Sequence, residues 1–114
     1  MQKVPLRVFY RTIDDLILNQ QSDAAISRSK CLLQEFPKNL SVYQLLGKAF
    51  LDKQEFDDAN TVFEKILEID PDDFVSHIGI SIISESFGNL DKALESMRRA
   101  YELQPSNESL QNEV

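Results

Sequence analysis

The sequence predicts an all-α fold, a solenoid of three tandem helix-turn-helix units. The main observation is a 34-residue period, a repeat length typical of stacked helix pairs. Three series of residues keep this period: Pro37, Pro71 and Pro105; Ala25, Ala59 and Ala93; Asp23, Asp57 and Asp91. The second observation is that apolar residues within each unit recur at helical spacing. We therefore expect one domain, 1–114, with repeats at 6–39, 40–73 and 74–107.

The first unit, 6–39, keeps this pattern with two departures. Its apolar and small positions are occupied by Phe9, Leu16, Ala25 and Leu32, and Pro37 closes the unit. Thr12-Ile13 stands where the middle unit has Leu46-Gly47, and Ser29 stands where it has Phe63. Terminal units of a helical solenoid are usually atypical, so these departures agree with the predicted fold.

The middle unit, 40–73, shows both helices most clearly. Asp57 falls in the first turn of the second helix, where a carboxylate interacts favourably with the helix dipole. Pro71 ends that helix, and the Asp73 side chain is expected to cap the next one. The two apolar faces comprise Leu40, Tyr43, Leu46 and Phe50 in the first helix, and Phe56, Ala59, Val62, Phe63, Ile66, Leu67 and Ile69 in the second.

The third unit, 74–107, is again atypical. Ala93, Met97, Ala100 and Pro105 fit the pattern, whereas His77, Ser81 and Ser84 are expected to weaken the packing face of its first helix. Residues 108–114 are predicted to start a seventh helix. This short segment is either a capping element or the point where a longer protein continues, and we favour the second interpretation.

The middle unit resembles the tetratricopeptide repeat family. Its matching residues are Tyr43, Leu46-Gly47, Phe50, Ala59, Phe63 and Pro71. The small residues Gly47 and Ala59 would let the two helices of one unit approach closely, and the large aromatic residues would stack successive units. The resemblance implies a right-handed superhelix that binds polypeptides. In that family the first helix of each unit lines a concave groove, which receives an extended or helical partner segment.

The groove-facing residues follow from this resemblance and from the 34-residue period. They are the positions of the first helices that stacking does not use: Arg7, Tyr10, Asp14 and Ile17; Ser41, Gln44, Lys48 and Leu51; Val75, Ile78, Ile82 and Glu85. The predicted surface is mixed in charge and becomes apolar toward the C-terminal end. We expect it to bind a polypeptide segment of another protein, in an adaptor or scaffold role.

One subgroup of the family grips the C-terminal carboxylate of heat-shock proteins with a cluster of lysine and asparagine side chains. This sequence does not present such a cluster on the first helices. The corresponding region holds Tyr10, Asp14, Leu45, Val75 and Gly79. Recognition of a carboxylate pair by ammonium groups is therefore not predicted.

Val75, Ile78 and Ile82 form an apolar stripe at i, i+3 and i+7. One interpretation is a docking strip for an apolar or amphipathic partner segment. In the alternatives, the helix is rotated so that the stripe is buried, or later repeats cover it. A further alternative for the whole chain is a structural, self-associating segment of a larger protein without a peptide ligand of its own.

Composition excludes several other functions. A net charge of −7 repels phosphate backbones, so nucleic acid is not an expected partner. No apolar run approaches the roughly 20 residues of a membrane span, and we expect a cytoplasmic protein. The single histidine, His77, shares the predicted stacking position of Phe9 and Tyr43, and Cys31 is expected to be a partly exposed structural thiol. No catalytic or cofactor site is predicted, because the sequence has one histidine, one cysteine and no Gly-rich phosphate loop. No metal site is predicted either, because the acids Glu68, Asp70, Asp72 and Asp73 lack the spacing and the glycine of a calcium loop.

Overall fold

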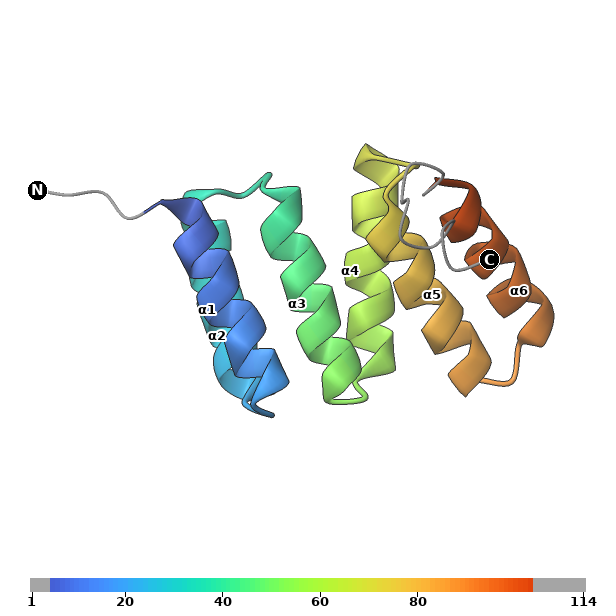
Figure 1. Ribbon diagram of the computed structural model, residues 1–114, viewed down its shortest axis with the longest axis horizontal. Coiled ribbons are helices and arrows are strands. Elements are labelled where there is room, and N and C mark those ends of the chain that lie inside the picture. The colour runs from blue at the N-terminus through green and yellow to red at the C-terminus, as the bar shows by residue number, and fades with distance from the viewer. Residues whose placement is uncertain (1–4, 104–114) are drawn as a thin grey trace, which may run out of the picture.

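The computed structural model describes residues 5–103, which form three antiparallel helix pairs arranged side by side (Figure 1). No β-strand occurs between residues 5 and 103. The predicted all-α solenoid is confirmed, and the predicted seventh helix at 108–114 lies outside the described residues. The helices are α1 (Leu6–Leu18), α2 (Ser22–Glu35), α3 (Leu40–Asp52), α4 (Phe56–Ile69), α5 (Phe74–Ser86) and α6 (Leu90–Leu103).

Helix ends recur at the same positions of successive units. The side chain of Asn39 accepts a hydrogen bond from the Val42 amide at 3.2 Å, and Asp73 accepts one from the Ser76 amide at 2.9 Å. Both residues therefore act as N-caps, as predicted for Asp73. The turn inside each unit contains one residue with positive φ, and these residues are Gln20, Gln54 and Gly88.

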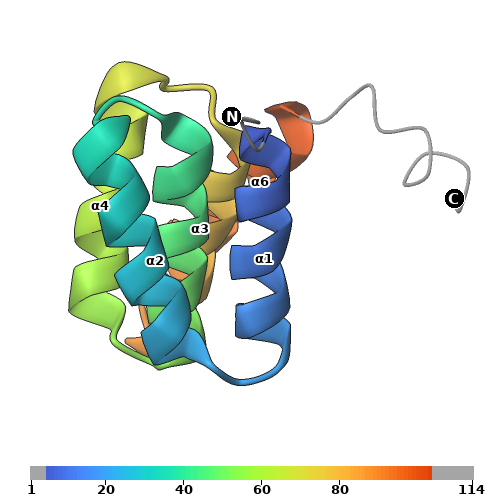
Figure 2. The same cartoon turned by 90° about the vertical axis from the view of Figure 1, so that its left-hand side faces the viewer.

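The first helices of the three units lie on the inner side of the solenoid. α1 contacts α3 and α3 contacts α5, whereas α2 and α4 do not contact one another. Since the first helices converge and the second helices diverge, α1, α3 and α5 form the concave face. A view from the N-terminal end shows α2 and α4 on one side and α1 on the other (Figure 2).

Phe63 of α4 is the centre of the packing between the second and third units. Its ring is fully buried and lies against two glycines, Gly47 of α3 and Gly79 of α5. A Cβ atom at Gly47 would lie 2.6 Å from the ring, and a Cβ atom at Gly79 would lie 2.3 Å from it. The ring therefore lies between the two glycines, with Gly47 at one edge and Gly79 at the other. We call this arrangement of Gly47, Phe63 and Gly79 the clamp.

The predicted stacking position differs between the three units: Tyr43 is partly buried against the core, whereas Phe9 is exposed and does not stack. Phe9 is 39% exposed. The Tyr43 hydroxyl donates to the Pro37 carbonyl at 3.2 Å, and its ring lies 5.1 Å from the Lys65 ammonium within the same unit. In the third unit, His77 Nε2 lies 2.8 Å from the carbonyl oxygen of Pro71. In α3 and α5 the side chain at this position therefore bonds to the loop that precedes its helix.

The predicted weakening of α5 by Ser81 and Ser84 is also wrong. Both serines are buried, and α5 packs directly on α6, whose Ala93 and Ala100 are buried as well. Small side chains on the two helices let the helix axes approach closely. The serines thus form a packing face, and α5 is not rotated to bury its apolar stripe.

Candidate functional site on the concave face

A hollow of about 480 Å³ opens on the concave face between α1, α3 and α5. We call this hollow the groove. Phe63 of α4 and Gly79 of α5 form part of its lining, so the clamp that joins two units also supports the groove. The other lining residues are Ile17, Lys48, Leu51, Asp52, Val75, Ile78 and Ile82.

The apolar stripe of α5 forms one wall of the groove. Val75 and Ile78 are half-buried, and Ile82 is 44% exposed. Ile17 and Leu51 occupy the same repeat position on α1 and α3, and they extend the apolar lining across all three units. Since side chains from three helices converge here, the groove offers apolar contact to an inserted side chain of a partner.

The charged residues of the groove are paired with neighbours in this chain. Lys48 Nζ lies 3.1 Å from Asp14 Oδ1, which links α3 to α1. Asp52 Oδ2 accepts a hydrogen bond from the Ser22 hydroxyl at 2.6 Å. Both interactions hold the first two units together at the groove edge. Asp52 remains exposed and gives this rim a negative charge.

Tyr10 and Gln44 use their polar groups to join successive units. The Tyr10 hydroxyl accepts a hydrogen bond from Asn39 Nδ2 at 2.7 Å, and Gln44 Nε2 donates to Asp73 Oδ1 at 2.5 Å. In each case the partner is the residue that caps the next first helix. Ile78 stands at the same repeat position, so in the third unit this polar link is replaced by an apolar side chain.

The structure separates the twelve predicted groove-facing residues into two groups. Six line the groove together: Ile17, Lys48, Leu51, Val75, Ile78 and Ile82. The other six lie outside it. Asp14 forms the ion pair to Lys48, and Tyr10 and Gln44 link successive units. Three are exposed, namely Arg7 on α1, Ser41 on α3 and Glu85 on α5.

Asp52, Phe63 and Gly79 line the groove but were not among the predicted binding residues. Helical spacing offers a signal for Asp52, because it lies four residues after the predicted groove residue Lys48 and so shares its helix face. It offers none for Phe63, since that side chain reaches the groove from a second helix.

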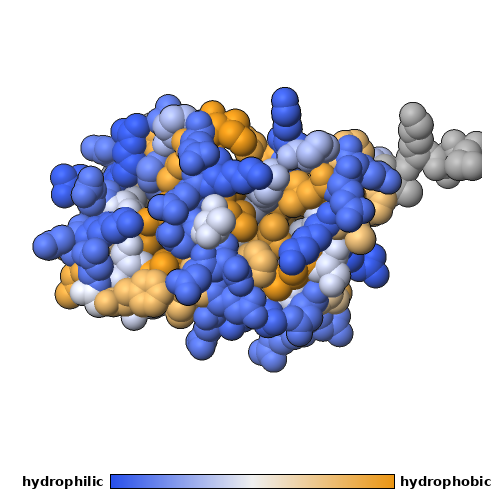
Figure 3. All heavy atoms as spheres, turned by 180° about the vertical axis from the view of Figure 1, so that it is seen from behind, coloured by the Kyte–Doolittle hydropathy of each residue, from blue (hydrophilic) through white to orange (hydrophobic). Residues whose placement is uncertain are grey.

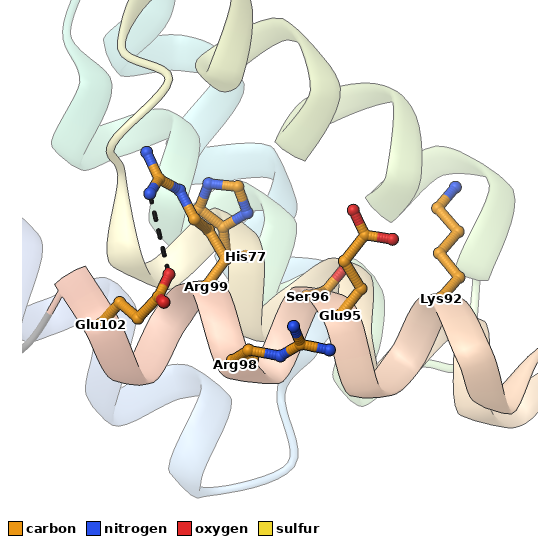
Figure 4. A pocket seen from close by; sticks show the side chains of 7 residues that line it. All are labelled: His77, Lys92, Glu95, Ser96, Arg98, Arg99 and Glu102. Carbon is orange, nitrogen blue, oxygen red and sulfur yellow. Dashed lines mark ion pairs between the residues drawn. The ribbon is translucent and has the colours of Figure 1, made fainter.

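The outer face of the solenoid is different in character. Seen from behind, it is covered mostly by hydrophilic residues (Figure 3). A second hollow between α5 and α6 is lined by His77 and six residues of α6, whose side chains are shown in Figure 4. Arg99 is paired with Asp72 at 2.9 Å and with Glu102 at 3.8 Å. This hollow therefore has no concentrated charge of one sign.

His77 and Cys31 do not line the groove. Between residues 5 and 103 there is no group of three or more histidine, cysteine or acidic side chains arranged to hold a metal ion. His77 Nε2 is occupied by the Pro71 carbonyl, and Cys31 is exposed on α2. Within the same range no helix is long and apolar enough to cross a membrane.

Two family models describe almost all of this architecture. One tetratricopeptide repeat model matches residues 16–77, and a second matches residues 76–107. The chain belongs to the tetratricopeptide repeat family. Interaction with other proteins is the general activity of this family, and the groove lies on the face formed by its first helices.

Curated relatives are much longer than this chain. The mouse (Mus musculus) mitochondrial import receptor subunit TOM70 is 26% identical over 86 residues, which are 75% of this chain and 14% of that protein. Superkiller protein 3 of Saccharomyces cerevisiae is 29% identical over 73 residues, which are 64% of this chain and 5% of that protein. The chain thus corresponds to a small part of each relative.

Solved structures with the same fold include MamA proteins. One MamA crystal structure superposes with a TM-score of 0.75 at 20% identity, covering 90% of this chain and 60% of that chain. MamA from Desulfovibrio magneticus RS-1 gives a TM-score of 0.74 at 20% identity, covering 87% and 56%. At this identity the similarity is one of fold.

Proposed function

We propose that this chain is a peptide-binding adaptor module and that its groove receives an amphipathic segment of a partner protein. The observation that carries this proposal is the convergence of Ile17, Leu51 and the Val75, Ile78, Ile82 stripe around one hollow. An amphipathic helix presents side chains at i, i+3 and i+4 to such a surface. We further propose a cytosolic location, with which the single exposed thiol of Cys31 is compatible.

The charge of the chain indicates the polarity of the partner. The net charge is −7, and the groove rim carries exposed Asp52, while Lys48 is neutralised by Asp14. A segment with basic residues beside its apolar ones would be attracted over a distance set by the ionic strength. The proposed ligand is therefore a basic amphipathic helix, and its association rate should fall as salt is added.

The test is a selection of peptides from a library of basic amphipathic helices, followed by calorimetry on purified variants. Ile78→Asp with Ile82→Asp places two charges in the groove and should abolish binding, because a charge in an apolar contact is costly. Ile69→Asp is the matched control, since Ile69 is an exposed isoleucine of α4 that does not line the groove. Equal affinity of the wild-type chain and the double variant would contradict the proposal.

A further inference from the structure

The turns that join the two helices of each unit lie at the same end of the solenoid (Figure 1). Two hollows open beside these turns, one between the first and second units and one between the second and third. We call them the Lys53 hollow and the Phe87 hollow. The Lys53 hollow is lined in part by Gln20, Gln21, Ser22, Asp23, Ala24 and Lys53, and the Phe87 hollow by Gln54, Glu55, Phe56, Asp57, Asp58 and Phe87. Each residue of the second set follows one of the first by 34 positions, so the two hollows are the same place in successive units.

A lysine provides a cation in the Lys53 hollow. Lys53 Nζ donates a hydrogen bond to the Asp23 carboxylate of the first unit, and it lies 3.1 Å from Glu55 Oε1. These hydrogen bonds raise the pKa of Lys53, because they stabilise its charged form. At this place, a cation from one unit is therefore held by a carboxylate of the preceding unit.

The Phe87 hollow has an aromatic residue at the cation position and carries more negative charge. Three differences between the hollows change the charge: Phe87 stands in place of Lys53, Glu55 in place of Gln21, and Asp58 in place of Ala24. Asp57 keeps the carboxylate of Asp23, and both Asp57 and Asp58 are exposed. Glu55 is paired with Lys53, whereas no ion pair between residues 5 and 103 includes Asp57 or Asp58. Among the described residues, these two carboxylates thus have no cation partner where the preceding unit provides one.

The Phe87 ring is held in place and is nevertheless open to solvent. It packs edge-to-face on Phe56, with ring centroids 5.9 Å apart and ring planes at 76°, and Phe87 is 64% exposed. The face of an aromatic ring attracts a cation. A planar guanidinium group can stack on such a ring and donate hydrogen bonds to a carboxylate at the same time, whereas an ammonium group is a compact point charge. The combination of ring and carboxylates therefore favours arginine over lysine.

We propose that the Phe87 hollow binds an arginine side chain of a partner protein. The guanidinium group stacks on Phe87 and pairs with Asp57, in the place that the Lys53 ammonium group occupies one unit earlier, and Asp58 adds to the attraction. The net charge of −7 favours the approach of a basic partner. This hollow shares no lining residue with the groove, so the proposal does not depend on the ligand proposed for the groove.

NMR of the ¹⁵N-labelled chain during titration with N-acetyl-arginine amide tests this proposal. The probe carries the guanidinium group without the terminal charges of the free amino acid. We expect the amide signals of Gln54, Asp57, Asp58 and Phe87 to shift together and to saturate. N-acetyl-citrulline amide has nearly the same shape and no charge, and it should leave these signals in place. Equal shifts with the citrulline probe, or tighter binding of N-acetyl-lysine amide, would overturn the proposal.

Phe87→Lys places the cation of the Lys53 hollow into the Phe87 hollow. It should weaken binding of the arginine probe at least tenfold, because the new ammonium group occupies the site and removes the ring. The matched control is Leu94→Lys, which adds the same charge at an exposed position of α6 that lines neither hollow, and it should bind the probe as the wild type does.

Equal affinity of the wild type and Phe87→Lys for the arginine probe would contradict the proposal, as would the absence of any saturable shift in the wild type. Circular dichroism checks that the variant is folded. If Phe87→Lys is unfolded, Asp57→Asn with Asp58→Asn takes its place, since it removes the two charges and keeps the shape of both side chains. The same loss of affinity is expected, and unchanged affinity would contradict the proposal in the same way.

Discussion

Replacing Gly79 by alanine is the sharpest test of the packing between the second and third units. The new Cβ atom would lie 2.3 Å from Phe63 Cε2 and 2.6 Å from Cδ2 and Cζ. The ring cannot retreat, because its opposite edge lies against Gly47, where a Cβ atom would be 2.6 Å away. The strain must therefore be taken up by a shift of α5 relative to α4.

Two opposing effects set the size of the change. Alanine favours a helix interior over glycine by about 1 kcal/mol. Overpacking a rigid core typically costs about 1–3 kcal/mol. We expect the packing effect to dominate at Gly79, with a net loss of up to about 2 kcal/mol in the free energy of unfolding. For a domain of this size each kcal/mol corresponds to about 4–8 °C in Tm.

The assay is equilibrium unfolding in urea, followed by circular dichroism, on a double-mutant cycle of Gly79→Ala and Phe63→Leu. Leucine is smaller than phenylalanine and makes room for the new methyl group, so the double variant should be more stable than the sum of the single effects predicts, by about 1 kcal/mol or more. Gly88→Ala is the control. Its φ of 79° makes alanine unfavourable there, but no atom lies within 4 Å of the new Cβ, so its effect should add to that of Phe63→Leu. A stabilising effect of Gly79→Ala, or strict additivity in the cycle, would refute the claim that Phe63 packs tightly between Gly47 and Gly79.

Three further predictions concern single side chains. Ser29→Ala should raise the free energy of unfolding by about 1 kcal/mol, because the fully buried hydroxyl has no hydrogen-bond partner; a thermal melt checks this, and a lower Tm would contradict it. Asn39→Ala should cost about 1 kcal/mol through the lost cap, with extra loss from the bond to Tyr10; chemical denaturation measures it, and Lys38→Ala serves as the neutral control. Hydrogen bonds to Asp23 and Glu55 raise the pKa of Lys53 above 10.5. The stability that Lys53 contributes is therefore complete below pH 10.5 and is lost as the pH rises further. The unfolding curves of the wild type and Lys53→Met should converge at high pH, and a difference that stays constant with pH would contradict the assignment.

Periodicity predicted those parts of the fold that depend on local pattern. The spacing of Pro37, Pro71 and Pro105 marked the unit ends, and Asp73 could be recognised as a cap because capping involves residues only three apart. The role of Gly79 could not be predicted in the same way. Its partner, Phe63, lies on another unit, and only the three-dimensional stacking shows that the two residues share one space.

The candidate site was predicted only in part, because helical periodicity shows which residues share a face but not which side chains meet between units. Ile17, Leu51 and Ile82 lie on the predicted groove faces of three different helices, α1, α3 and α5. The stacking of units brings these faces together around the groove. Tyr10 and Gln44 share that face in sequence, yet their polar groups bond to the caps of the next unit. A helical pattern gives the direction of a side chain but not the length of its reach, and these two side chains are long enough to cross to a neighbouring helix.

The most direct test of the proposed binding groove is methyl NMR of the isoleucine-labelled chain during titration with a selected basic amphipathic peptide. The account predicts that the Ile17, Ile78 and Ile82 methyl signals shift together and saturate with one affinity, while the Ile26 and Ile69 signals stay in place. Saturable shifts confined to Ile26 or Ile69, with Ile78 and Ile82 unchanged, would contradict the claim that the concave groove binds the partner.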